Sequence, residues 1–72
     1  MSTMATSWRA AAAEAMEAKE EAVLAAVAGL DGLDGMYAER PEIRDLIQSL
    51  RGLLEFDAEN LRNTAARLRD GA

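Results

Sequence analysis

This 72-residue sequence contains no cysteine and no histidine. Without cysteine the chain has no disulfide, and without either residue it lacks the commonest zinc ligands. Histidine is also the usual general base near neutral pH, so Ser49 and Thr64 have no partner to activate them as nucleophiles. We therefore predict a protein without catalytic residues, bound metal, cofactor or small-molecule substrate.

Positive charge is scarce, and long hydrophobic runs are absent. The formal net charge is −5, and no basic stripe exists to neutralise phosphates, so general nucleic-acid binding is not expected. No segment approaches the roughly 20 apolar residues of a membrane span. The first residues lack the basic region of a secretory signal. These features predict a cytoplasmic protein that does not contact a membrane.

Aromatic residues are also few, and much of the hydrophobic content is alanine. A chain of this length buries only about 60% of the surface that its unfolded form exposes. Disulfides and metal, two of the usual supplements to so small a core, are unavailable. We therefore expect stability to come partly from association with another protein.

Two helices are predicted within a single domain spanning residues 1–72. The first, at about residues 6–29, consists almost wholly of strong helix formers. Thr6 or Ser7 can cap its start, and Gly29 is a candidate stop. Its larger apolar residues recur every seven positions but are flanked by alanine, so this helix offers a thin apolar face.

The second helix is predicted at about residues 41–69. Pro41 suits the first helical position, where the missing N–H costs nothing, and Gly71 is a candidate terminator. The pattern implies an antiparallel all-α hairpin.

The apolar stripe of the second helix is wider than the alanine-rich first helix can cover. Leaving about four of its aliphatic side chains in water would forgo roughly 1.5–3 kcal/mol each. The hairpin should therefore complete a four-helix bundle, either by dimerisation or by packing on another helical protein, in a coiled-coil-like manner. The predicted partner-binding residues are Ile43, Leu46, Ile47, Leu50, Leu53, Leu54, Leu61, Leu68 and, as an exposed anchor near the N-terminus, Trp8.

Residues 30–40, with the pairs Asp31-Gly32 and Asp34-Gly35, are interpreted as the turn. Leu30, Leu33, Met36 and Tyr37 would fold inward to cap the hairpin. An EF-hand alignment fits only at its two ends, so a cation-responsive switch at Asp31, Asp34 and Glu39 is the lesser alternative.

A turn centred on residue 35 or 36 would bring Glu14, Glu17 and Glu21 beside residues 50–57, within reach of Arg51. We expect these carboxylates to form a solvated, partly ion-paired face. By the same geometry Trp8 would lie near Arg67, where it either stacks on an arginine and closes the bundle end or anchors a partner.

Polar residues interrupt the apolar stripe of the second helix at Asp57, Asn60 and Thr64. They either specify register inside a seam or face water, and we favour the second arrangement, with Ala58 and Ala65 at the core positions.

In overall plan the chain resembles the small helical-hairpin co-chaperones and needle subunits of bacterial type III secretion systems. The resemblance rests on the segments "ERPEIRDLIQSLRGLLEFD" and "LRNTAARLRD", with Pro41, Gln48 and the leucine spacing. It implies a partner-binding hairpin. The plan also resembles Rop-type hairpins, which dimerise into four-helix bundles and can bind RNA, a role that would use Arg62, Arg67 and Arg69. We predict a non-catalytic protein–protein interaction module: an adaptor, co-chaperone, small regulator or assembly subunit.

Overall fold

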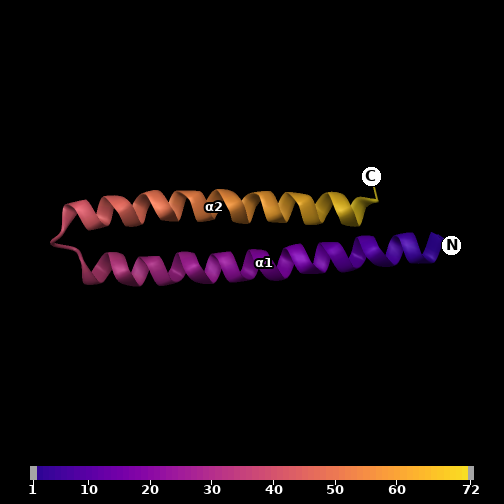
Figure 1. Cartoon of the computed structure of the whole chain (residues 1–72), viewed down its shortest axis with the longest axis horizontal. Helices are drawn as coiled ribbons and strands as arrows, with labels where there is room; N and C mark the ends of the chain where they lie inside the picture. Colours follow the sequence, from indigo (N-terminus) through magenta and orange to yellow (C-terminus); the bar gives the residue numbers. More distant parts are fainter. Residues whose placement is uncertain (1, 72) are drawn as a thin grey trace.

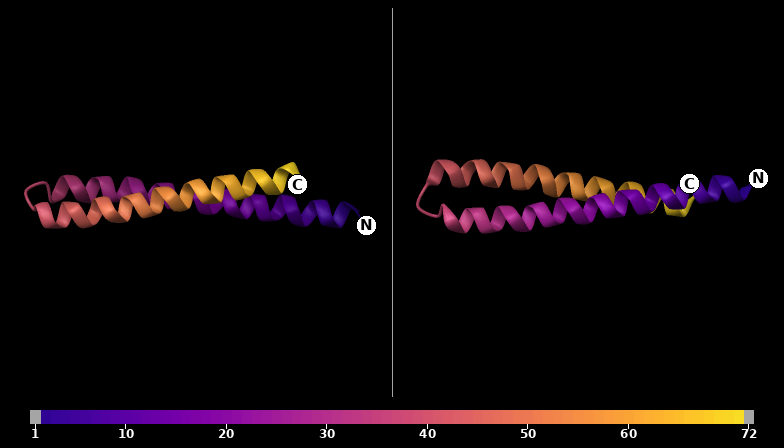
Figure 2. Two further views of the ribbon diagram at one scale, coloured as in Figure 1. Left: turned by 90° about the horizontal axis from the view of Figure 1, so that it is seen from above. Right: turned by 60° about the horizontal axis from the view of Figure 1, so that its bottom comes forward.

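The computed structural model describes the backbone of residues 2–71 and the side chains from Trp8 onward. Its two long helices, α1 (Ser2–Met36) and α2 (Pro41–Asp70), pack antiparallel as a hairpin (Figure 1). The principal extents are 59 × 16 × 11 Å, and Figure 2 shows the two helices crossing at a shallow angle. This confirms the predicted all-α hairpin. Neither helix, over its described residues, has a stretch apolar enough to cross a membrane.

The bounds of α2 are those expected, to within one residue. Pro41 is the first helical residue, and Arg40 before it lies outside the helical region at φ −117° and ψ 87°, in keeping with the steric exclusion of helical backbone before proline. At the other end Gly71 adopts the left-handed conformation (φ 69°), and its N–H donates to the carbonyl of Leu68 at 3.3 Å. Arg67 and Arg69 lie in the last turn, where the helix dipole favours positive charge.

The predicted bounds of the first helix are wrong at both ends. The helix begins at Ser2, and the proposed Thr6 or Ser7 cap concerns side chains outside the described part of the chain. It also continues past Gly29 and through both Asp-Gly pairs to Met36. No described residue other than Gly71 has a positive φ, so the glycines at 32 and 35 are ordinary helical residues and not turn residues.

The turn is consequently short and lies at residues 37–40 instead of 30–40. The N–H of Arg40 donates to the carbonyl of Tyr37 at 2.9 Å, which closes it. Because the turn lies later in the chain, each residue of α1 meets a later residue of α2 than we predicted. Glu20 lies between Glu17 and Glu21, which we expected beside residues 50–57, yet it accepts a hydrogen bond from Arg62.

The inward folding predicted for the residues of this end is also wrong for most of them. Met36 is 75% exposed, and Leu33 and Tyr37 are exposed as well, whereas Leu30 is half-buried. Leu30 belongs to the seam because it follows Val27 by three residues on the same side of α1.

The core of the hairpin is thin. Its buried hydrophobic residues, among those described, are Ala13, Val27, Ile47, Ala58 and Ala65. Only Val27 and Ile47 are larger than alanine, and the described part of the chain has no large side chain that is completely buried. Alanine lets the two helices approach closely but contributes little apolar area. The seam therefore joins the helices without supplying a large core.

Candidate interaction surface

One side of the seam is closed by ion pairs between the helices. Arg44 contacts Asp34 at 3.1 Å and Arg51 contacts Asp31 at 3.2 Å. Two further pairs, Arg62–Glu20 at 2.8 Å and Arg69–Glu17 at 2.6 Å, continue the row toward the termini. We call this row the closed flank. Its carboxylates at Glu20 and Asp34 are only 16% and 20% exposed, so these side chains cover the seam as well as pairing charges.

The pair nearest the termini is bidentate. Arg69 donates from Nε and Nη2 to the two carboxylate oxygens of Glu17, at 2.8 and 2.6 Å. These hydrogen bonds hold the pKa of Glu17 below its ordinary value of 4.5, and they raise the pKa of Arg69. Of the three carboxylates in the predicted, partly ion-paired acidic face, Glu17 forms an ion pair, and its partner is Arg69 and not Arg51.

The other side of the seam carries hydrophobic residues instead. On α2 the stripe formed by positions 46, 50, 53, 57, 60 and 64 follows the alternating four- and three-residue spacing of one helix face. Its first three members are leucines, and Leu46, Leu50 and Leu53 are 66%, 52% and 67% exposed. Three consecutive leucines of one stripe are therefore left mostly in water, as the width of the apolar pattern predicted.

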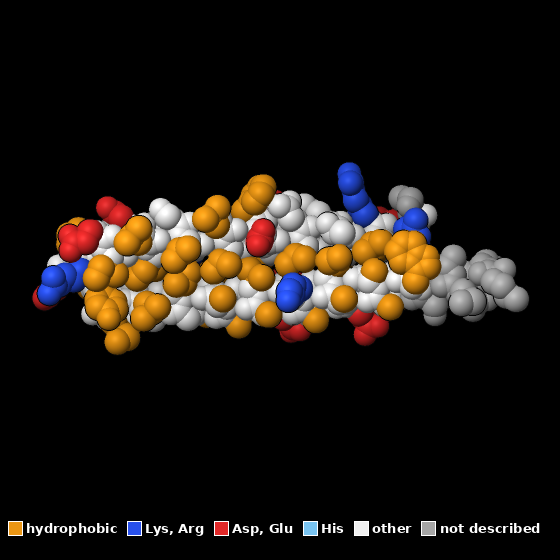
Figure 3. All heavy atoms as spheres, viewed as in Figure 1, with side chains coloured by type: hydrophobic (Ala, Val, Ile, Leu, Met, Phe, Trp, Pro, Cys, Tyr) orange, Lys and Arg blue, Asp and Glu red, His pale blue; other side chains and the backbone are white. Residues whose placement is uncertain are grey.

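On α1 the matching stripe consists of positions 19, 23, 26, 30, 33 and 37, with the same spacing. Val23 and Leu30 are half-buried along the seam, and Leu33 is exposed. We call the two stripes together the open face. Figure 3 shows hydrophobic side chains of both helices forming a band along the seam, most densely toward the turn.

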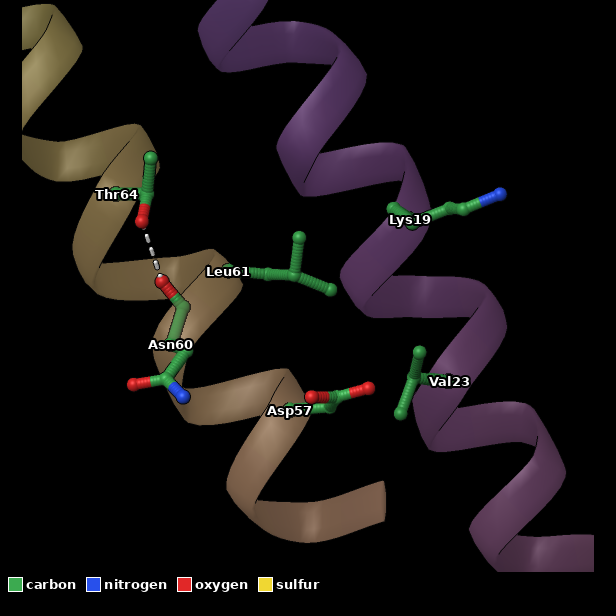
Figure 4. A pocket seen from close by; sticks show the side chains of 6 residues that line it. All are labelled: Lys19, Val23, Asp57, Asn60, Leu61 and Thr64. Carbon is green, nitrogen blue, oxygen red and sulfur yellow. Dashed lines mark hydrogen bonds between the residues drawn. The ribbon is translucent and has the colours of Figure 1, made fainter. Parts of the chain in front are cut away.

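Midway along the open face lies a hollow of about 360 Å³, lined by Lys19, Val23, Asp57, Asn60, Leu61 and Thr64 (Figure 4). Leu61 points across it toward α1, and the carboxylate of Asp57 also points toward α1. The ammonium of Lys19 points away from α2. Neither charged group has an ion-pair partner among the described residues.

The polar residues of the stripe face water, as favoured from the sequence. Asp57, Asn60 and Thr64 are exposed, whereas Ala58 and Ala65 are 1% and 2% exposed. The hydroxyl of Thr64 donates to the carbonyl of Asn60 at 2.8 Å, which satisfies it within the helix. These residues therefore do not specify register inside the hairpin seam.

The residues predicted to bind a partner divide into three groups in the structure. Ile47 is buried within the hairpin, so it supports the surface and does not form part of it. Ile43, Leu54, Leu61 and Leu68 are half-buried along the seam. Leu46, Leu50, Leu53 and Trp8 are exposed.

Trp8 is 57% exposed near the N-terminal end of α1. The guanidinium carbon of Arg9 lies 5.5 Å from the centre of its ring, within the range of a cation–π contact. An arginine does stack on Trp8, but it is the neighbouring Arg9 and not Arg67.

Most residues of the two lesser alternatives, though not Glu39 or Arg67, form ion pairs within the described hairpin. Asp31 and Asp34, proposed as cation ligands, pair with arginines of α2. No group of carboxylates in the described part of the chain has the geometry of a metal site. Arg62 and Arg69, proposed as phosphate contacts, pair with glutamates of α1.

Comparison with known proteins identifies no relative of this chain. No protein-family model matches the chain, and neither the curated proteins nor the solved structures contain a match.

Proposed function

We propose that this protein is a non-catalytic interaction module that binds a helical protein through its open face. The observation that carries the proposal is the exposure of Leu46, Leu50 and Leu53 beside a core that is mostly alanine. Covering side chains of this size and exposure would contribute about 1–2 kcal/mol each. Their sum is comparable with the marginal stability of a small domain.

A helix is the form of partner that suits this surface. The two stripes run side by side along the hairpin, and a groove between two helices accepts the apolar face of a third. An adaptor, co-chaperone, small regulator or assembly subunit would each use the surface in this manner.

Site-specific photocrosslinking in the cells that make the protein tests this function. A photoreactive phenylalanine analogue is placed at position 53 on the open face or, as the matched control, at position 24. Leu24 is a similarly apolar, exposed residue of α1, but it lies seven residues from both Glu17 and Asp31 and so belongs to the closed flank.

We expect protein adducts from position 53 and few or none from position 24. The adducts at position 53 should disappear when Leu46 and Leu50 are replaced by glutamine. Absence of any protein adduct at position 53, or equal crosslinking from both positions, would contradict a binding role for the open face.

A further inference from the structure

The open face is apolar in the half nearest the turn and polar in the other half. Nearest the turn, α2 presents Leu46, Leu50 and Leu53, and α1 presents Leu33 with Leu30 half-buried beside it. Toward the termini the stripes carry Asp57, Asn60 and Thr64 on α2 and Lys19 on α1. A second copy covers each half with residues of the same kind only if the two turns lie at the same end.

A two-fold axis along the seam gives this orientation. It places α2 of one copy over α1 of the other at the same height, so the apolar half of each open face packs on the apolar half of its mate. The opposite orientation, with the turns at different ends, would stack α2 on α2 and α1 on α1. Leu46, Leu50 and Leu53 of each copy would then meet the polar residues Asp57, Asn60 and Thr64 of the other, which buries polar groups against apolar side chains.

The charges of the open face support the same orientation. Lys19 is the one charged residue in the α1 stripe, and Asp57 is the one charged residue in the α2 stripe. They line the same hollow, so they lie at the same height along the hairpin. Rotation about an axis parallel to the seam preserves height and exchanges the helices, so Lys19 of each copy meets Asp57 of the other.

These two groups are available for such contacts. Both are exposed, and neither forms an ion pair within the described part of the hairpin. The ammonium of Lys19 is directed away from α2 of its own copy (Figure 4). An isologous interface requires this arrangement, in which residue i contacts residue j and residue j contacts residue i.

The available area is adequate for a dimer. The 30 residues of α2 extend about 45 Å at 1.5 Å per residue. With the 16 Å width of the hairpin, they offer a face of roughly 700 Å², close to the ~800 Å² that each partner buries in a standard interface.

We infer that the helical partner of the open face is a second copy of this chain, bound with both turns at one end as a parallel pair of hairpins. The resulting four-helix bundle contains two symmetric Lys19–Asp57 ion pairs between the copies. This inference rests on the proposed function of the open face and names its occupant.

Sedimentation equilibrium of the purified full chain over a wide concentration range tests the occupant. We expect a dimer that dissociates on dilution, and Leu53→Glu should raise its dissociation constant by about a hundredfold or more, because two carboxylates would enter the interface. The matched control Leu24→Glu should leave the dissociation constant unchanged. A strict monomer, a larger assembly, or a dimer insensitive to Leu53→Glu would overturn the inference.

A charge exchange tests the orientation without changing the apolar surface. Lys19→Asp and Asp57→Lys, each alone, place like charges together in a homodimer and should weaken it by about tenfold or more. An equimolar mixture of the two variants restores opposite charges at both contacts, so we expect a heterodimer as tight as the wild-type dimer. Both residues are exposed, so these variants should retain the hairpin, which circular dichroism checks. If the mixture associates no better than either variant alone, the proposed orientation is wrong.

The photocrosslinking test of the proposed function and the tests of the second-copy inference can fail separately. If position 53 crosslinks only to a different protein, the open face binds a partner but the second-copy inference falls. If position 53 crosslinks to nothing, the proposed function itself falls.

Discussion

The two sides of the hairpin seam are closed in different ways, although the same two helices supply both. The closed flank is covered by ion pairs, from Asp34–Arg44 near the turn to Glu17–Arg69 near the termini. The open face has a band of leucines whose side chains are more than half exposed. Exposed hydrophobic residues at scattered positions are normal, but leucines gathered on one side require an explanation.

This difference shows that charge pairing and apolar burial serve separate purposes here. Exposed ion pairs contribute little stability, yet a row of them between the helices penalises other registers and keeps that flank hydrated. The open face carries Leu33, Tyr37, Leu46, Leu50 and Leu53 among the exposed large hydrophobic residues, whereas Trp8, Leu24, Met36 and Phe56 lie elsewhere on the described part of the chain. The hairpin is thus asymmetric, with ion pairs on one side of the seam and exposed leucines on the other.

The largest expected effect on stability comes from shortening a buried side chain at the boundary between the core and the open face. Ile47 is 7% exposed, whereas its neighbour Leu46 is 66% exposed. Ile47→Ala should lower the free energy of unfolding by about 2–4 kcal/mol because it leaves a cavity in the seam. Leu46→Ala should lower it by less than about 1 kcal/mol when the chain is dilute enough to be monomeric. Urea unfolding followed by circular dichroism measures both, and equal losses would show that Leu46 is covered within the monomer.

A larger side chain in the seam should push the two helices apart and so affect both sides of the hairpin. Ala65 is 2% exposed where the helices approach closely, and Ala65→Leu should cost about 1–3 kcal/mol of stability through overpacking. The neighbouring exposed position gives the control, since Ala66→Leu changes the same residue type in water and should be nearly neutral. Thermal melting of the two variants distinguishes them. A neutral Ala65→Leu would mean that the helices are not in close contact there.

Both sides of the seam depend on the continuation of α1 through the Asp-Gly pairs. Asp34 lies on the closed flank and Leu33 on the open face only if the helix continues there. Gly32 is helical with open space around its Cβ position, so Gly32→Ala should stabilise the chain by about 0.5–1 kcal/mol. Gly71→Ala should instead destabilise it by about 1 kcal/mol, because φ is +69° there. Loss of stability in Gly32→Ala would favour the turn that the sequence alone suggested.

The smallest effect concerns the closed flank and its dependence on pH. The pKa of Glu17 is depressed in the folded chain by its hydrogen bonds with Arg69. A depressed carboxyl pKa contributes stability that is present above the unfolded value and is lost as the pH falls through the folded value. Stability should therefore decline slightly below about pH 4.5, less so in Glu17→Gln and in high salt. Side-chain carboxyl NMR measures the pKa directly, and Arg69→Gln should return it toward 4.5. An unchanged value in Arg69→Gln would exclude this pair as the cause.

The sequence predicted α2 and its surface better than α1. Pro41 and Gly71 act within a few residues of themselves, so the bounds of α2 follow from local chemistry. The exposure of Asp57 and the burial of Ala58 follow from helical periodicity once the apolar stripe is placed. The width of that stripe indicated that some aliphatic side chains would remain uncovered, but it did not distinguish the exposed Leu46, Leu50 and Leu53 from the others of the stripe.

The ion pairs of the closed flank were beyond such reasoning. Glu17 and Arg69 are 52 residues apart in the chain, and nothing local to either identifies the other. The turn was also predicted at the wrong position. Moving the turn by a few residues changes which residue of α2 lies opposite each residue of α1. One signal was available: Asp31 and Asp34 lie three residues apart and Arg44 and Arg51 lie seven apart, so each pair shares one helix face and is compatible with cross-helix pairing.

Composition and periodicity by themselves determined that this chain forms two amphipathic helices, with an aliphatic surface on the second that is too broad for the first. Those properties depend on residues within one or two helical turns of each other. Only the tertiary structure decided that the Asp-Gly pairs are helical, which residues face one another, and which side of the seam stays open. Local preference at Gly29, Gly32 and Gly35 favours a turn by a small margin, whereas burying Val27 and Leu30 and pairing Asp31 and Asp34 with α2 favours continued helix. The sum of those cross-helix interactions is the larger effect, and it exists only when the two halves of the chain have come together.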